Sequence, residues 1–486
     1  MKTKLINWWE SLKTSFWFIP TLMVLAAILI SICIINLDRY SITDSVRFLG
    51  FLNSVSPEGA RSILSTLAAS MMTVTGVTFS ITIVVLNLAS SQFGPRLLRN
   101  FIRDKSIQFV LGTFVASFIY CLLVLRSIQV VGEDIFVPTL SVTFAVGLAL
   151  LDAGVLIYFI HHIATSIQAD EVVAGVSEEL ECNVRRIFTT ELNDQPDEIT
   201  DKISQLQEEN KAHYHNHTII ADRKGYLQAI DLDGLLQTAK ENDYLIRLQI
   251  RPGQFVVTDG TLAVVSSEKK FDINLTKGIT KAFIVGSNPT SEQDLEYSIH
   301  QLVEVAIRAL SPGINDPFTA IACVDQLGAA LCHLAKKKFP SSSYFDDQGQ
   351  LRLKIKPFTY SGMLNASFDQ IRQYGRPSIS VTIRLLETLL LIAEHTLLAE
   401  QRKAIHRQAN MILRASQETV FEPNDREDVQ KRYELLLCTL NRFNDAAGLY
   451  EFPDGLSASP MQAIGLFDQQ RNRKNVHVHE ENIVVQ

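Results

Sequence analysis

Four long apolar runs organise the first third of the chain. They occupy residues 16–37, 63–88, 107–128 and 136–160, and most of the charged residues lie between them. A helix rises about 1.5 Å per residue and the hydrocarbon core of a bilayer is about 30 Å thick, so each run is long enough to cross it. The pattern therefore predicts a multi-pass α-helical membrane protein with four spans within residues 1–164.

The second run differs from a plain lipid anchor because it carries many small and polar side chains. At about 100° per residue, one set of them falls along a single stripe of the predicted helix. The set consists of Thr66, Thr73, Gly76, Ser80, Asn87 and Ser91. Val77 and Val84 interrupt this stripe with apolar side chains. The opposite side of the helix is assigned to lipid or to a neighbouring helix, with Val85 as a lipid-facing reference.

Two interpretations of the stripe stay open at this stage. Small residues let helices approach closely in lipid, and their hydroxyl or amide groups can form hydrogen bonds between helices. Alternatively, the stripe lines a water-filled pore in a homo-oligomer that passes ions. Val77 and Val84 would then form an apolar constriction that closes by losing its water.

Asp152 is the one formal charge within the fourth run. A carboxylate at that depth is costly unless it is paired, protonated or hydrated. A hydrogen bond to Thr113 or Ser117 of the third run would give it a structural role. A position on an ion or proton pathway would give it a functional one.

The exit from the second run is predicted to be an elbow formed by Gly94, Pro95 and Arg96. Glycine relaxes the backbone, and proline disfavours a helical conformation at the residue before it. The following residues, 97–103, have the pattern of a short amphipathic helix at the membrane surface. Such an elbow could transmit a conformational change to the second span.

The distribution of cations predicts the orientation of the spans. Lysine and arginine are most frequent before the first run and between the second and third runs, at Lys2, Lys4, Lys13, Arg96, Arg99, Arg103 and Lys105. Both termini are therefore expected in the cytoplasm of a bacterium, with the spans in its inner membrane. Residues from 161 onward would then form a cytoplasmic region.

This region changes character along its length. The pattern predicts a helical connector at 165–216, a small β domain at 217–290, a helical domain at 291–450 and a polar tail at 451–486. In the β domain, the spacing of strand and turn signals resembles the hairpins of biotinyl and lipoyl carrier domains. This resemblance implies a barrel-like shape, but not the carrier chemistry, because no lysine lies at the hairpin tip.

A corner motif interrupts the helical domain at Ser311, Pro312, Asn315, Asp316 and Pro317. Asp316 is suited to cap a new helix, and Pro317 is tolerated at its first position. The motif is therefore interpreted first as a structural corner and second as a binding loop.

Composition excludes several classes of function. The formal net charge of -7 argues against nucleic acid as a main partner. The six cysteines have no CxxC spacing and are expected to be reduced thiols. Because the sequence contains no recognisable nucleophile, phosphate-binding or dinucleotide motif, we expect no enzymatic activity, cofactor or metal site.

Three segments together resemble a known bacterial family. They are residues 76–96, residues 159–163 at the end of the fourth run, and residues 309–320 around the corner motif. They are similar to the predicted membrane proteins called domain of unknown function 2254, which implies four spans and a cytoplasmic domain but no established activity. Our leading hypothesis is a homo-oligomeric channel gated by the cytoplasmic domain. The alternatives are a non-conducting scaffold or sensor, and a transporter that uses Asp152.

Overall fold

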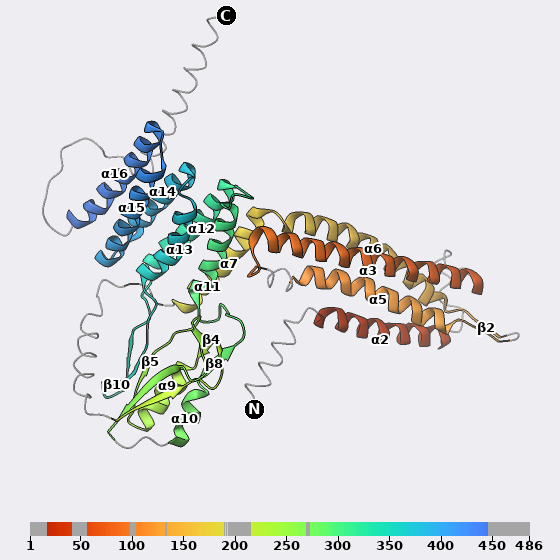
Figure 1. Ribbon diagram of the computed structural model, residues 1–486. Helices are drawn as coiled ribbons and strands as arrows, with labels where there is room; N and C mark the ends of the chain where they lie inside the picture. Colours follow the sequence, from red (N-terminus) through yellow and green to blue (C-terminus); the bar gives the residue numbers. More distant parts are fainter. Residues whose placement is uncertain are drawn as a thin grey trace, which may run out of the picture. The chain divides into compact units, whose positions relative to one another are not determined.

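The structure is a computed structural model of the 486-residue chain. It describes residues 17–40, 56–97, 104–131, 134–188, 190, 192, 215–268 and 273–445. The polar tail and the proposed surface helix at 97–103 lie almost wholly outside these residues. The chain divides into two compact units, Met1–Val172 and Val173–Gln486 (Figure 1).

The first unit is a bundle of four long helices that run alongside one another (Figure 1). They are α2 (Phe18–Tyr40), α3 (Pro57–Phe93), α5 (Lys105–Ser127) and α6 (Thr139–Ser166), with a short hairpin of β1 (Gln129–Val131) and β2 (Asp134–Phe136) between the last two. Each apolar run of the sequence is therefore confirmed as a helix. The second is much longer than its apolar run because the Ser56 side chain and Pro57 start it early, with Ser56 accepting a hydrogen bond from the Gly59 N–H.

Helix α5 is the centre of the bundle and packs against α2, α3 and α6. In the most apolar 18-residue stretch of α5, 67% of the residues are buried, against 22% in the corresponding stretch of α3. Helix α5 is therefore surrounded by protein, while α3 lies at the edge of the bundle. Two apolar clusters hold the bundle. One joins Leu64 and Tyr120 to Val142, and the other joins Phe114 to Phe159.

A carboxylate from α2 caps the start of α6. Asp38 accepts hydrogen bonds from the N–H groups of Leu140 and Ser141, each at 3.0 Å, and from the Ser141 hydroxyl at 2.6 Å. The residue before α6 is Pro138, which provides no side-chain cap. The unpaired N–H groups of the first turn are therefore satisfied by a residue about a hundred positions away in the sequence.

The second unit begins within α7 (Ala169–Ile187) and contains two sheets. The strands are β3 (His215–Ile220), β4 (Gly225–Ile230), β5 (Leu245–Leu248), β6 (Phe255–Val256), β7 (Thr261–Ser267), β8 (Phe283–Gly286), β9 (Ser343–Phe345) and β10 (Leu351–Lys354). Five of them form one sheet in the order β3-β7-β5-β10-β9, and three form another in the order β6-β4-β8. Helices α9 (Leu232–Glu241) and α10 (Ile273–Thr280) accompany them.

The prediction of a barrel-like β domain is wrong. Within the described residues the strands form two open sheets, not a closed barrel. One reason is that β10 pairs in parallel with β5, placing Leu353 opposite Ile246. Leu353 is fully buried among Ile219 and Val265 of the same core. The larger sheet is thus completed by β9 and β10, which lie within the segment 291–450 that the sequence pattern assigned to a helical domain.

The remaining helices form the rest of the second unit. They are α11 (Leu295–Ala309), α12 (Pro317–Ala335), α13 (Tyr360–Tyr374), α14 (Ile379–His395), α15 (Ala399–Thr419) and α16 (Pro423–Asp445). Helix α12 is a fifth helix that is long and apolar enough to cross a membrane. However, 61% of the residues in its most apolar 18-residue stretch are buried inside the protein, and it packs against α11, α13 and α14.

Candidate functional site

The small polar stripe of α3 lies on the exposed side of that helix. All six residues are exposed: Thr66, Thr73, Gly76, Ser80, Asn87 and Ser91. The two interrupting valines are exposed as well, Val77 at 54% and Val84 at 64%. No other part of the described first unit covers this face, so the stripe is not explained by packing within one copy of the chain.

The opposite side of α3 packs on the bundle. It consists of Ala60, Leu64, Ala68, Met71, Thr78, Thr82, Val85, Ala89 and Phe93, all of them buried. The sequence pattern assigned Val85 to lipid, but Val85 is only 6% exposed and belongs to a buried apolar cluster with Ile107, Val110 and Phe114 of α5. Ala60 and Ala68 of this face belong to a second buried cluster with Tyr120 and Val124 of α5.

The hydrogen bonds of the stripe remain mostly within α3. The Thr66 hydroxyl donates to the Ser62 carbonyl at 2.8 Å, and the Thr73 hydroxyl donates to the Ala69 carbonyl at 2.9 Å. The Asn87 amide has no partner in the described part of the chain. A Cβ atom added at Gly76 would meet nothing within 4 Å. The small size of Gly76 is thus not required by the chain's own packing.

Asp152 of α6 is buried and lacks a hydrogen-bond partner. It is 1% exposed, and neither carboxylate oxygen has a partner among the described residues. The Thr113 hydroxyl donates to the Phe109 carbonyl of its own helix at 2.8 Å. Ser117 of α5 lies beside the carboxyl group without forming a hydrogen bond of acceptable geometry. Of the two partners considered from the sequence, Thr113 bonds to its own helix, and Ser117 is the one that lies beside the Asp152 carboxyl group. A carboxyl group in such an apolar interior is costly unless it is paired, protonated or hydrated.

The elbow after α3 has the predicted backbone conformation. The helix ends at Phe93, and Gly94 follows with a φ of 109°, a conformation that side-chain-bearing residues rarely adopt. The Leu97 N–H donates to the Gly94 carbonyl at 3.3 Å, which makes the next three residues a tight turn. Pro95 and Arg96 are both exposed on this turn.

A polar cluster that the sequence did not reveal joins α5 to the end of α6. Asp104 caps α5 by accepting from the Ser106 N–H at 2.8 Å, and its other oxygen lies 2.6 Å from Nε2 of His162. The Tyr158 ring stacks on the His162 ring with centroids 5.7 Å apart, and its hydroxyl donates to Ser106 Oγ at 3.1 Å. No sequence motif signals this contact, because its two halves are more than fifty residues apart.

The corner motif is confirmed as a helix start. Asp316 accepts hydrogen bonds from the N–H groups of Phe318 and Thr319 and from the Thr319 hydroxyl, the last at 2.6 Å. The hydroxyl contact with Thr319 is the main cause of a lowered pKa of Asp316. Asn315 has a φ of 50°, which turns the chain before Pro317. Ser311, whose carbonyl accepts from the Asn315 N–H, and Pro312 complete the corner. Its role as a binding loop remains untested.

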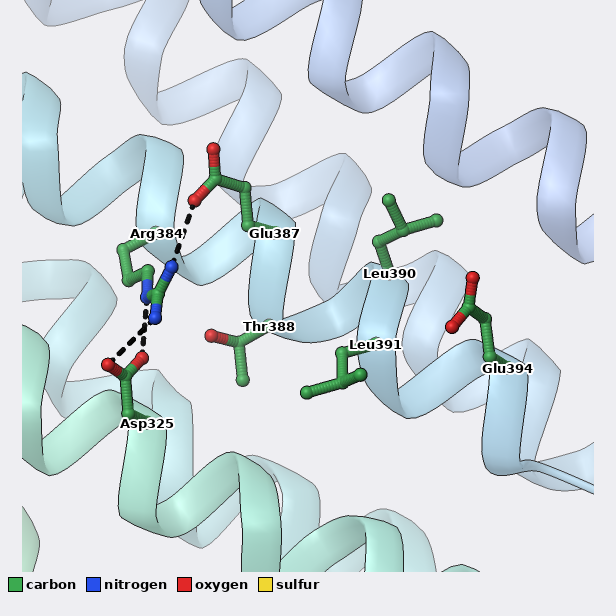
Figure 2. Close-up of a pocket in the computed structure, with 7 residues that line it drawn as sticks. All are labelled: Asp325, Arg384, Glu387, Thr388, Leu390, Leu391 and Glu394. Carbon is green, nitrogen blue, oxygen red and sulfur yellow. Dashed lines mark hydrogen bonds and ion pairs between the residues drawn. The ribbon is translucent and has the colours of Figure 1, made fainter. Parts of the chain in front are cut away.

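The second unit contains a small pocket between α12 and α14 (Figure 2). Arg384 lies at one end, with two bonds to Asp325 at 2.5 and 2.8 Å and one to Glu387 at 3.3 Å, while Glu394 lies at the other end (Figure 2). Glu387 also pairs with Arg432 of α16 at 3.0 Å. With a volume of about 200 Å³ the pocket is smaller than typical ligand sites. We interpret it as part of an ion-pair network that joins three helices.

Comparisons with known proteins identify relatives of the chain. The model of a family described as "Predicted membrane protein (DUF2254)" matches residues 13–390. Uncharacterized proteins of Mycobacterium tuberculosis, from two strains, and of Mycobacterium bovis are 30% identical over 428 residues, which is 86% of this chain and 79% of each relative. No solved structure matches the chain.

Proposed function

The chain belongs to the predicted membrane protein family DUF2254, and on this premise we propose that it forms a homo-oligomeric channel. In this proposal α3 lines the pore, and the second unit gates it. Four helices cross the bilayer: α2, α3, α5 and α6. Helix α12 is interpreted instead as a core helix, because it is buried among other helices and its Asp325 is paired with Arg384.

One observation carries the proposal: the small polar stripe of α3 is exposed, while the opposite face of α3 packs on the bundle. A polar face exposed to lipid is unfavourable, and an Asn amide in particular needs a hydrogen-bond partner there. A ring of identical α3 helices around a central axis would place Asn87 and Ser80 next to water or next to each other. The open space around Gly76 would then admit a neighbouring copy.

Gating is supported by the connection between the units. Only two residues, Ile167 and Gln168, separate α6 from α7. Helix α7 is held within the second unit by hydrogen bonds from Asn183 to Ser298 at 2.9 Å and from Ser177 to Gln326 at 2.7 Å. A movement of the second unit would therefore pull directly on the helix that carries Asp152.

The proposed orientation places both termini in the cytoplasm of the bacterium and the start of α3 on the outer side of the inner membrane. Glu58 is exposed in the first turn of α3. A Glu58→Cys variant without the native cysteines should therefore react with a membrane-impermeant thiol reagent added to intact spheroplasts. Labelling only after the membranes are disrupted would show that the orientation is the opposite one.

The channel itself is tested by making the apolar constriction polar. In planar bilayers, Val84→Ser should raise the basal current relative to the wild type, since a hydroxyl lowers the cost of filling a narrow apolar neck with water. Val146→Ser is the matched control, because Val146 is also an exposed valine, at 41%, but lies on α6. The control should leave the current unchanged.

Two outcomes would overturn the channel. One is a monomeric chain in a mild detergent and in nanodiscs. The other is an oligomer in which the wild type and Val84→Ser both stay silent across voltage and membrane tension. The second outcome would favour a non-conducting scaffold or sensor, which the bonds of Thr66 and Thr73 to their own helix also support, because hydroxyl groups satisfied in this way can face a neighbouring helix.

A further inference from the structure

An open groove of about 680 Å³ runs along the surface of the first unit between α5 and α6. Phe109 and Leu151 form its walls and are 47% and 51% exposed. Gly154 forms part of the floor, and a Cβ atom added there would meet nothing within 4 Å. Because both helices are apolar enough to cross a membrane, the groove opens towards the bilayer.

One end of the groove is polar. Lys105, Ser106 and Tyr158 line it, at the N-terminal end of α5. The Lys105 side chain is exposed and forms no ion pair with any described residue. Ser106 Oγ already accepts a hydrogen bond from the Tyr158 hydroxyl, so the Ser106 hydroxyl can donate its own hydrogen bond outward. The groove thus offers a cation and a hydroxyl donor at one end only.

The nearby carboxylate of Asp104 does not compete for the Lys105 ammonium group. One oxygen of Asp104 caps the Ser106 N–H, and the other is in contact with His162. From the polar end, α6 contributes Tyr158, then Gly154 and then Leu151, which spans roughly 10 Å at 1.5 Å per residue. The surface therefore changes from charged to apolar over the length of a lipid headgroup region and the start of an acyl chain.

We propose that this groove binds one anionic phospholipid. Its phosphate lies between Lys105 and Ser106, and an acyl chain lies along Phe109 and Leu151. Two features select the ligand: a cation that lacks a partner in the described chain, and an apolar floor kept open by a glycine. Lys105 also belongs to the cation-rich segment that marks the cytoplasmic side, where anionic lipids attract basic residues. The inference does not depend on whether the protein conducts ions.

The test is lipid titration of the full-length chain in detergent, followed by native mass spectrometry. Lys105→Gln should weaken binding of phosphatidylglycerol about five-fold, as expected for one lysine near a phosphate. Binding of phosphatidylcholine should weaken less, because its choline cation offsets the charge of the phosphate. Gly154→Leu should fill the floor and weaken both lipids. Gly147→Leu is the matched control, because Gly147 is an equally open glycine two turns away on α6, outside the groove, and should change neither.

Three results would overturn the site. The first is unchanged phosphatidylglycerol binding by Lys105→Gln, whose exposed side chain makes misfolding an unsuitable explanation. The second is equal lipid binding by Gly154→Leu and Gly147→Leu. The third is complete displacement of the lipid by glycerol 3-phosphate, which carries the phosphate without acyl chains and would reduce the site to a phosphate contact.

Discussion

The two units differ in whether their buried charged side chains have partners. In the second unit, Arg352 is 8% exposed in its side chain and lies between two carboxylates, Asp346 and Asp243. Arg251 likewise binds both oxygens of Glu296, at 2.6 and 2.7 Å. In the first unit, Asp152 is as deeply buried but has no hydrogen-bond partner within the described chain.

This difference indicates that Asp152 of the first unit needs a partner beyond the described chain, whereas the buried Arg352 of the second unit does not. A buried charge that is paired and hydrogen-bonded can be accommodated in a folded core, but a lone one requires water, a proton or another molecule. The exposed stripe of α3 points to the same conclusion, because its polar groups face away from every described helix of its own unit. In the proposed oligomer, a second copy of the chain would give the stripe a polar neighbour.

The largest expected effect comes from breaking a satisfied network in the second unit. Arg352→Ala should lower the free energy of unfolding by about 3 kcal/mol, because Asp346, itself 9% exposed in its side chain, would be left buried without its partner. Urea unfolding of the full-length chain in detergent measures it. The control is Arg223→Ala, which removes an exposed pair with Asp222 and should have little effect. Equal losses would show that burial of the charge is not what matters.

A second effect on stability, spread over several pH units, is expected at Asp294. Burial, and then the charge of Glu296, raise the pKa of Asp294 from 3.8 to about 7, although Arg251 acts in the opposite direction. Between pH 4 and 7 the unfolded chain would release this proton while the folded chain keeps it. Stability should therefore fall as pH rises through this window, by at most about 4 kcal/mol at about 1.4 kcal/mol per pKa unit, and level off above it.

Asp294→Asn should flatten this pH dependence, as measured by urea unfolding at several pH values. The result would be contradicted if the variant and the wild type lose stability in parallel. Gly253→Ala is not a suitable control, because a Cβ atom at Gly253 would overlap the Asp294 carboxylate.

The smallest effect on stability is expected in the first unit, at Asp152. Asp152→Asn should change the free energy of unfolding by less than about 1 kcal/mol, since no ion pair or hydrogen bond is lost. It should nevertheless alter the conductance of the oligomer, or the dependence of that conductance on pH, because the charge is removed while the shape is kept. Paired measurements of assembly and current decide this. Lost assembly together with unchanged current in the surviving oligomers would make the residue structural.

Much of the fold follows from local sequence signals. The four apolar runs became α2, α3, α5 and α6. The start of α12 at Asp316-Pro317 was also predicted, because capping depends on neighbours within three residues. Such features need only the period of the pattern and the local backbone.

The tertiary structure decided what each element faces. The sequence could not show that Val85 is buried in a cluster with residues of α5, that Asp38 caps α6, or that β10 joins β5 in parallel. Length and hydropathy alone do not separate α3 from the buried helix α12, since both satisfy the same criteria. The sequence determined which residues are apolar and how they repeat. Whether that face meets lipid, a neighbouring helix or a second copy depends on residues far away in the chain, which only folding brings together.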